Sequence, residues 1–237
     1  MTNPVFCALD TTDTAEAVRL ARQLAGLVGG VKVGLEFFSA NGPEGVRAIA
    51  ALGMPLFLDL KFHDIPNTVA GAMRAAVALA PTFTTIHACG GADMMRAAVE
   101  AAAEAAAKAG VARPRILAVT VLTSMSPADL AGVGVAGGLV DQVRRLAALA
   151  HEAGVDGLVC SPHEVEALRA LLGPEPALMV PGIRPAWAAS NDQKRILTPA
   201  EAMAKGASHL VIGRPITAAA DPALAARRIQ DELRAAP

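Results

Sequence analysis

Tyrosine is absent from this sequence of 237 residues, and aromatic residues make up only 3% of it, so its hydrophobic content of 53% is mainly aliphatic. Charged residues are also few, at 18% against roughly a quarter in an average domain. The formal net charge is −1, so no basic surface for nucleic acid or for an anionic membrane is indicated. A small anionic ligand would have to be held by local charges.

Long apolar runs and cysteine motifs are missing as well. No stretch of about 18 uncharged apolar residues predicts a membrane span. The first ten residues, MTNPVFCALD, lack the basic segment and apolar run of a secretory signal, so none is expected. The cysteines Cys7, Cys89 and Cys160 share no close spacing, and each lies in an apolar run typical of a strand. We therefore expect buried, reduced thiols in a cytoplasmic protein rather than disulfides, metal ligands or nucleophiles.

The sequence does contain a regular alternation of short apolar runs with amphipathic or Ala-rich segments. The apolar runs are nearly continuous, which is typical of parallel strands that are covered on both faces. The predicted strands are residues 5–10, 31–34, 55–62, 83–88, 116–122, 157–161, 177–181 and 209–213. The predicted helices are residues 14–27, 43–52, 67–79, 93–109, 139–152, 163–171, 199–205 and 221–235.

The strand–helix units show no break in composition from one end of the chain to the other. They predict an α/β protein in which residues 1–237 form a single domain, a (β/α)8 TIM barrel. The alternative, an open doubly wound sheet, would usually carry a G-x-G-x-x-G turn after its first strand. Residues 9–13, LDTTD, contain no glycine, which favours the barrel.

Polar residues gather where the predicted strands end. Because barrel enzymes build their sites at the C-terminal ends of the strands, we expect these residues to surround one opening, although each alone would also suit a solvated rim. They are Asp10, Lys32, Asp59, Lys61, Asp64, Thr123, Ser124, Arg184, Gly213 and Arg214.

The third predicted strand reads LFLDLKF at residues 56–62 and is the most informative. Alternation places Asp59 and Lys61 on one face and the apolar residues on the other, so the two charges are expected to point into the barrel mouth. A buried ion pair could be purely structural. Asp64 and Lys32 argue against that, because they add a second carboxylate and a second ammonium. Flanking carboxylates keep an ammonium charged and ready to protonate a carbanion.

The end of the eighth predicted strand has the character of a phosphate site. Loops after strands 7 and 8 often bind phosphate in barrels, and Gly213 with Arg214 offers close backbone approach and a charged fork. A plain turn would look similar. The loop over residues 181–193 is long enough to fold over a phosphate. None of the histidines has a partner at metal-ligand spacing, so we expect His87 to be structural, and Trp187 to pack.

Residues 59–68, DLKFHDIPNT, resemble the signature of the orotidine 5'-phosphate decarboxylases. Related phosphosugar lyases share the D-x-K-x-x-D core, whereas DIPNT points to the decarboxylases. The resemblance extends over nearly the whole chain and is closest to the short bacterial form. It includes ALD at 8–10, VKVG at 31–34, TIHA at 85–88, VLTSM at 121–125, PGIRP at 181–185, DQKR at 192–195 and IGRPIT at 212–217.

This resemblance implies decarboxylation of orotidine 5'-monophosphate to uridine 5'-monophosphate in pyrimidine biosynthesis, with no metal or organic cofactor. Lys61 would donate a proton to C6 of the pyrimidine, and Asp59 would lie beside the substrate carboxylate and hold Lys61. Asp64, Ile65 and Thr68 would complete the site of the neighbouring subunit in a homodimer. The resemblance implies further that Asp10 and Lys32 bind ribose and that Thr123 and Ser124 contact the pyrimidine. Gln193, Gly213 and Arg214 would bind the phosphate, with Arg184 in the closing loop, and Pro181 would also belong to the substrate site.

Two other functions remain open from the sequence. A metal-dependent phosphosugar decarboxylase or aldolase of the same superfamily would place an additional acidic metal ligand at the fourth strand, where this chain has His87-Ala88-Cys89-Gly90. A non-catalytic barrel that binds a nucleotide is the second alternative. The Asp59, Lys61 and Asp64 set argues against it.

Overall fold

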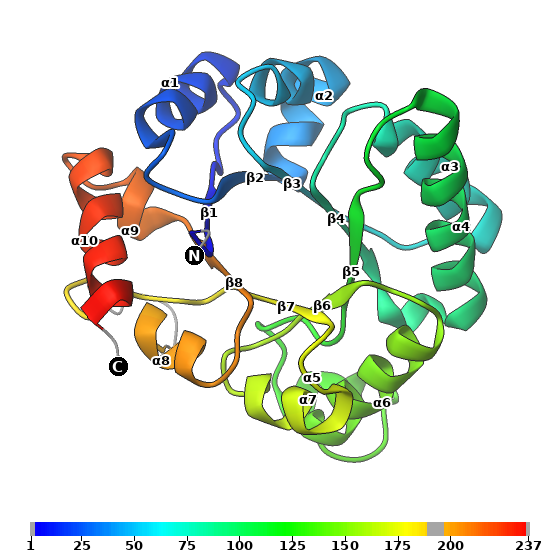
Figure 1. Cartoon of the computed structure of the whole chain (residues 1–237). Helices are drawn as coiled ribbons and strands as arrows, with labels where there is room; N and C mark the ends of the chain where they lie inside the picture. The colour runs from blue at the N-terminus through cyan, green and yellow to red at the C-terminus, as the bar shows by residue number, and fades with distance from the viewer. Residues whose placement is uncertain (1–2, 189–196, 236–237) are drawn as a thin grey trace.

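The computed structural model describes residues 3–188 and 197–235. Eight parallel strands form a closed barrel in chain order, and the helices surround it (Figure 1), which confirms the predicted fold. The strands are β1 (Val5–Ala8), β2 (Gly30–Gly34), β3 (Leu56–Phe62), β4 (Phe83–His87), β5 (Arg115–Val119), β6 (Gly157–Val159), β7 (Ala177–Val180) and β8 (His209–Ile212).

The helices alternate with these strands, with short additional helices after β4, β5 and β8. They are α1 (Thr14–Leu24), α2 (Leu35–Ala50), α3 (Pro66–Val77), η1 (Ala88–Gly90), α4 (Ala92–Ala109), α5 (Pro127–Gly132), α6 (Leu139–Glu152), α7 (Val165–Leu172), α8 (Pro199–Ala204), α9 (Arg214–Thr217) and α10 (Pro222–Ala235). Within residues 3–188 and 197–235, no helix is both long and apolar enough to cross a membrane.

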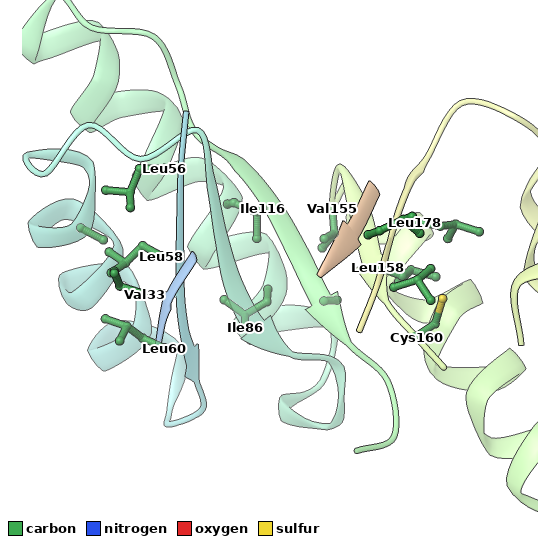
Figure 2. Packing of buried hydrophobic residues seen from close by; sticks show 14 of the residues in the cluster. Val33, Leu56, Leu58, Leu60, Ile86, Ile116, Val155, Leu158, Cys160 and Leu178 are labelled. Carbon is green, nitrogen blue, oxygen red and sulfur yellow. The ribbon is translucent and has the colours of Figure 1, made fainter. Parts of the chain in front are cut away.

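Two apolar layers form the core. The larger layer lies between the strands and the helices, and Figure 2 shows Leu56, Leu58 and Leu60 leaving β3 toward it. The smaller layer fills the barrel interior and includes Phe6, Phe57 and Phe83, whose rings meet edge to face at centroid distances of 5.5 to 6.3 Å. Three of the seven aromatic residues thus lie where a barrel needs bulky side chains to fill its interior.

The structure corrects several predicted boundaries. Most strands end one to three residues before the predicted limit. The helix predicted over 43–52 is wrong in its start: α2 begins at Leu35 and is kinked at Gly42, whose φ is 58°. Pro43 follows that kink rather than opening the helix. The short helices α5 and α9 carried no periodic signal and were not predicted.

The N-terminal end of the barrel is tied together by buried polar contacts. The guanidinium of Arg169 in α7 donates to the carbonyl oxygens of Gly206 at 2.8 Å and Pro176 at 2.7 Å, and to Oγ of Ser208 at 2.7 Å. These bonds join the loop before β7 to the loop before β8. Asp156 plays a similar part before β6, where its carboxylate accepts hydrogen bonds from Arg113.

His209 lies at the start of β8, at this same end of the barrel. Its ring is 5.6 Å from that of Phe6 and 5.0 Å from that of Phe83, centroid to centroid. Its Nδ1 is buried and has no hydrogen-bond partner among the described residues. Burial lowers the pKa of His209 to about 4, and the positive charge of Arg115 adds to the effect. The folded protein therefore holds this ring neutral.

We predict that His209→Leu makes the fold less sensitive to acid. In the unfolded chain the histidine takes a proton near its ordinary pKa of 6.5, whereas the folded protein resists protonation until about pH 4. The unmodified protein therefore loses up to about 3 kcal/mol of stability as the pH falls through this window. Below it, both states carry the proton and the loss stops. Urea unfolding measured across this window tests the difference.

The matched control for this experiment is His163→Gln, which changes an exposed histidine before α7. It should keep the pH dependence of the unmodified protein. Equal loss of stability with falling pH in the His209→Leu and unmodified proteins would contradict the prediction.

Candidate active site

A cavity of about 330 Å³ opens at the C-terminal ends of the strands. Most of the polar residues predicted for the site line it: Asp10, Lys32, Asp59, Lys61, Thr123, Pro181, Arg184, Gly213 and Arg214. Ser124, Asp64, Ile65 and Thr68 are not among its lining residues. Gln193 lies outside the described residues. The polar residues at the strand ends therefore meet at one opening, as the sequence predicted. Of the described residues that do not line it, Asp64, Ile65 and Thr68 follow β3, and Ser124 follows β5.

Four charged side chains form a row of alternating sign across this opening. The Nζ of Lys61 is 2.8 Å from Oδ2 of Asp59, and the Nζ of Lys32 is 4.0 Å from the same oxygen. Lys32 is also 3.1 Å from Oδ1 of Asp10. Lys32 and Asp59 are each only 9% exposed. The Asp59 carboxylate is therefore held between two ammonium groups in a largely buried place.

Strand β3 is irregular where it carries these charges. Its pairing with β4 shifts between Leu58 and Phe62: β3 advances four residues there while β4 advances two, from Thr84 to Ile86. Lys61 has a φ of 51°, a conformation that is rare for a long side chain. Bulges and unusual backbone angles of this kind are concentrated at active sites because they aim side chains that a regular strand would not.

Thr85 on β4 secures the irregular segment. Its Oγ1 accepts a hydrogen bond from the backbone N–H of Lys61 at 2.9 Å and donates one to Oδ1 of Asp59 at 2.9 Å. Thr85 is fully buried. The sequence analysis did not identify Thr85 as a site residue. The only available signal was two adjacent threonines, Thr84 and Thr85, in an otherwise apolar strand.

The cavity also has an apolar lining, which was not predicted from the sequence. Its side chains come from the ends of several strands and the loops that follow them. They are Ala8, Phe57, Val119, Val121, Leu122, Val159, Ile183, Val211 and Pro215. The cavity thus combines charged with apolar side chains, a combination that suits a flat, partly polar ligand.

Cationic side chains stand at the ends of β7 and β8. Arg184 is only 5% exposed and lines the cavity. Its backbone N–H donates to the carbonyl of Leu197 at 3.1 Å, which ties together the two ends of the loop after β7. Gly213 precedes α9, and Arg214 is the first residue of that short helix. A short helix after β8 is the usual phosphate-binding element of a barrel.

Asp64 and its neighbours form an exposed edge beside the cavity. Residues 63–68 are all exposed, and Ile65 keeps 66% of its surface. Oδ1 of Asp64 accepts a hydrogen bond from the N–H of Ile65 at 2.6 Å. Within the described part of this single chain, Asp64 makes no ion pair with Lys61. Among the residues that the structure describes, Lys61 thus pairs with one carboxylate, that of Asp59.

The residues near His87 do not resemble a metal site. The rings of His63 and His87 are 5.5 Å apart, and Sγ of Cys89 is 4.0 Å from Nε2 of His63. Burial lowers the pKa of His87, and the nearby His63 and Lys61 add to this, so its ring stays neutral near pH 7. Among residues 3–188 and 197–235, no group of three His, Cys, Asp or Glu side chains could hold a metal ion.

The structure also gives the positions of Cys89 and Trp187. Cys89 was predicted to be a buried strand residue, and that is wrong: the chain turns into η1 after β4, which leaves Cys89 exposed. Trp187 is partly buried and packs against the core. The guanidinium carbon of Arg228, a residue of α10, lies 4.3 Å from the centroid of its ring. Packing was the expected role for Trp187.

Comparison with known proteins agrees with this geometry. The sequence profile of the Orotidine 5'-phosphate decarboxylase / HUMPS family matches residues 3–229. An orotidine 5'-phosphate decarboxylase of Paramagnetospirillum magneticum is 62% identical over 233 residues, which are 98% of this chain and 99% of that protein. The crystal structure of the orotidine 5'-phosphate decarboxylase from Lactobacillus acidophilus has a TM-score of 0.84 at 39% identity and covers 98% of this chain and 100% of that one.

A second curated relative, from Rhodospirillum rubrum, bears the same name and is 60% identical over 232 residues, 98% of this chain and 94% of that protein. The match thus extends over all eight strands of the barrel, including the charged third strand and the ends of strands 7 and 8. The chain belongs to the orotidine 5'-phosphate decarboxylase / HUMPS family.

Proposed function

We propose that this protein decarboxylates orotidine 5'-monophosphate to uridine 5'-monophosphate, a step of de novo pyrimidine biosynthesis. The observation that carries the proposal is the Asp59 carboxylate held between the ammonium groups of Lys32 and Lys61 inside the cavity. The family profile spans more than one activity. The names of the full-length relatives favour the decarboxylase.

The charged and apolar side chains of the cavity fit the parts of this substrate. The pyrimidine would lie against the apolar side chains with Thr123 and Ser124 near its polar edge, and ribose hydroxyls would meet Asp10 and Lys32. The phosphate would lie between Arg184 and the Gly213-Arg214 turn, with Gln193 added by family resemblance. Arg184 supports this placement, because a buried guanidinium needs an anionic partner to offset its desolvation.

The proposed chemistry uses Lys61 as a general acid. The bond between C6 and the carboxylate breaks, CO₂ leaves, and the electron pair stays on C6. Nζ of Lys61 then donates a proton to C6, and solvent returns a proton to the amine. The charge of Asp59 disfavours the substrate carboxylate beside it, while the ammonium groups favour the developing carbanion. Binding energy from the remote phosphate helps to close the site around the reacting carbon. The chemistry we propose needs no metal or organic cofactor.

The working enzyme, in this proposal, is a homodimer in which Asp64, Ile65 and Thr68 complete the neighbouring site. The exposure of residues 63–68 beside the cavity supports this, as does the apolar surface of Ile65. An acid from the partner subunit would give Lys61 its second carboxylate. We also propose a cytoplasmic location, which agrees with three cysteines that form no disulfide.

Lys61→Ala is expected to lower turnover by at least about 1,000-fold, because it removes the proton donor from the reacting carbon. Binding of uridine 5'-monophosphate should remain measurable, since the phosphate and ribose contacts are intact. The assay follows the absorbance of orotidine 5'-monophosphate with purified, EDTA-treated protein. Lys108→Ala, an exposed change in α4, is the control. Near-normal turnover in folded Lys61→Ala protein would refute the role.

Arg184→Ala is expected to weaken binding of uridine 5'-monophosphate by about 10- to 100-fold, the loss of one charge-assisted contact to phosphate. Binding of uridine, which has no phosphate, should not change. Calorimetric titration with both ligands separates the two effects. Arg144→Ala, which alters an exposed arginine of α6, serves as control. Equal affinity for the monophosphate before and after the change would exclude Arg184 from the phosphate site.

Mixing the inactive variants Lys61→Ala and Asp64→Ala is expected to restore activity. If each site takes Lys61 from one subunit and Asp64 from the other, a mixed dimer has one intact site. Random exchange then recovers up to about a quarter of the unmodified rate. The measurement is turnover after joint dilution and reassociation. Sites contained within single subunits predict no recovery, because every subunit keeps its own defect.

A further inference from the structure

We infer that Thr85 is a positioning residue that holds Asp59 and Lys61 in their working arrangement through one hydroxyl group. The inference rests on the proposed function, because it deepens the role of these two residues. The hydroxyl group lies 2.9 Å from both the backbone nitrogen of Lys61 and Oδ1 of Asp59. Thr85 comes from β4, so it ties the irregular part of β3 to the neighbouring strand.

The direction of both hydrogen bonds is determined by simple counting. A threonine hydroxyl has one proton to donate, and a backbone N–H can only donate. The oxygen of Thr85 must therefore accept from Lys61, and its single proton goes to the Asp59 carboxylate, which accepts. The bond to the carboxylate is charge-assisted and takes place in a fully buried setting. No other arrangement of this one proton satisfies both partners.

The first bond compensates for a gap in the strand pairing. Between Leu58 and Phe62, β3 has no regular Cα partner on β4. The N–H of Lys61 lies within this gap. The φ of Lys61 is 51°, a strained value for lysine. A buried N–H without an acceptor would be costly. The Thr85 hydroxyl supplies the acceptor and so stabilises the backbone turn that sends the Lys61 side chain into the cavity.

The second bond fixes the carboxylate. Oδ2 of Asp59 receives the Lys61 ammonium at 2.8 Å, while Oδ1 receives the Thr85 hydroxyl. With both oxygens held from different directions, the carboxylate cannot rotate without breaking a contact. Thr85 thus holds the backbone of Lys61 and, through Asp59, its side-chain nitrogen as well. Small displacements of a proton donor lower the rate of the chemical step more than ligand affinity.

The neighbouring residue Thr84 provides a matched control. It is on the same strand and fully buried, but its Oγ1 has no hydrogen-bond partner among the described residues. Replacing either threonine by valine preserves the shape of the side chain and exchanges only the hydroxyl group for a methyl group. Thr84→Val therefore tests the general effect of the substitution on this strand, and Thr85→Val tests the two hydrogen bonds.

Steady-state kinetics with orotidine 5'-monophosphate are expected to separate the variants. Thr85→Val should lower kcat by about 10- to 100-fold, the effect of losing a buried hydrogen bond to a charged group, with KM changed by less than about threefold. Thr85→Ser, which keeps the hydroxyl, should recover most of kcat. Thr84→Val should behave as the unmodified protein. If Thr85→Val does not fold, as judged by circular dichroism, Thr85→Ala takes its place.

Hydrogen exchange at the backbone amide of Lys61 tests its hydrogen bond to Thr85 without a measurement of catalysis. Exchange should be faster in Thr85→Val and unchanged in Thr85→Ser and Thr84→Val. Unaltered exchange at Lys61, an unchanged kcat in Thr85→Val, or equal losses in both valine variants would overturn the inference. An unmodified protein that does not turn over orotidine 5'-monophosphate would instead contradict the proposed function, and the exchange experiment would still decide the role of Thr85.

Discussion

The arrangement of the site depends on one buried carboxylate, that of Asp59, placed between two ammonium groups. A lone charge in this position would cost several kcal/mol, so each member of the row requires its neighbours. Lys32 is balanced by both Asp10 and Asp59, whereas Lys61 has a single acid among residues 3–188 and 197–235. That asymmetry is the physical reason to look for a further carboxylate from outside the chain, at the exposed edge beside Lys61.

The two ends of the barrel have different roles. At the N-terminal end, Arg169 and Asp156 satisfy the loop backbone with many internal hydrogen bonds. At the C-terminal end, charges line an open cavity, and Lys61 adopts a strained backbone angle. Stability and reactivity thus draw on different residues, a separation typical of this fold.

The alternation of apolar and polar residues along single strands was enough to predict the barrel, the facing of Asp59 and Lys61, and the polar lining of the cavity, but not its apolar lining. Asp59 and Lys61 face the cavity as predicted although β3 is irregular. Between the paired positions, β3 has two more residues than β4. Because two is an even number, the inward and outward faces of the strand stay unchanged. The φ of Lys61, the tie to Thr85 and the kink at Gly42 could not be predicted. They depend on contacts between segments distant in the sequence or on local backbone geometry, which residue patterns do not encode.

The position of Trp187 has a practical consequence for spectroscopy. The chain has one tryptophan and no tyrosine, so its near-ultraviolet emission comes almost entirely from this indole. The ring lies under the guanidinium of Arg228, at the corner where the segment after β7 meets α10. While the barrel stays folded, the fluorescence of this protein is therefore a local probe of the surroundings of Trp187.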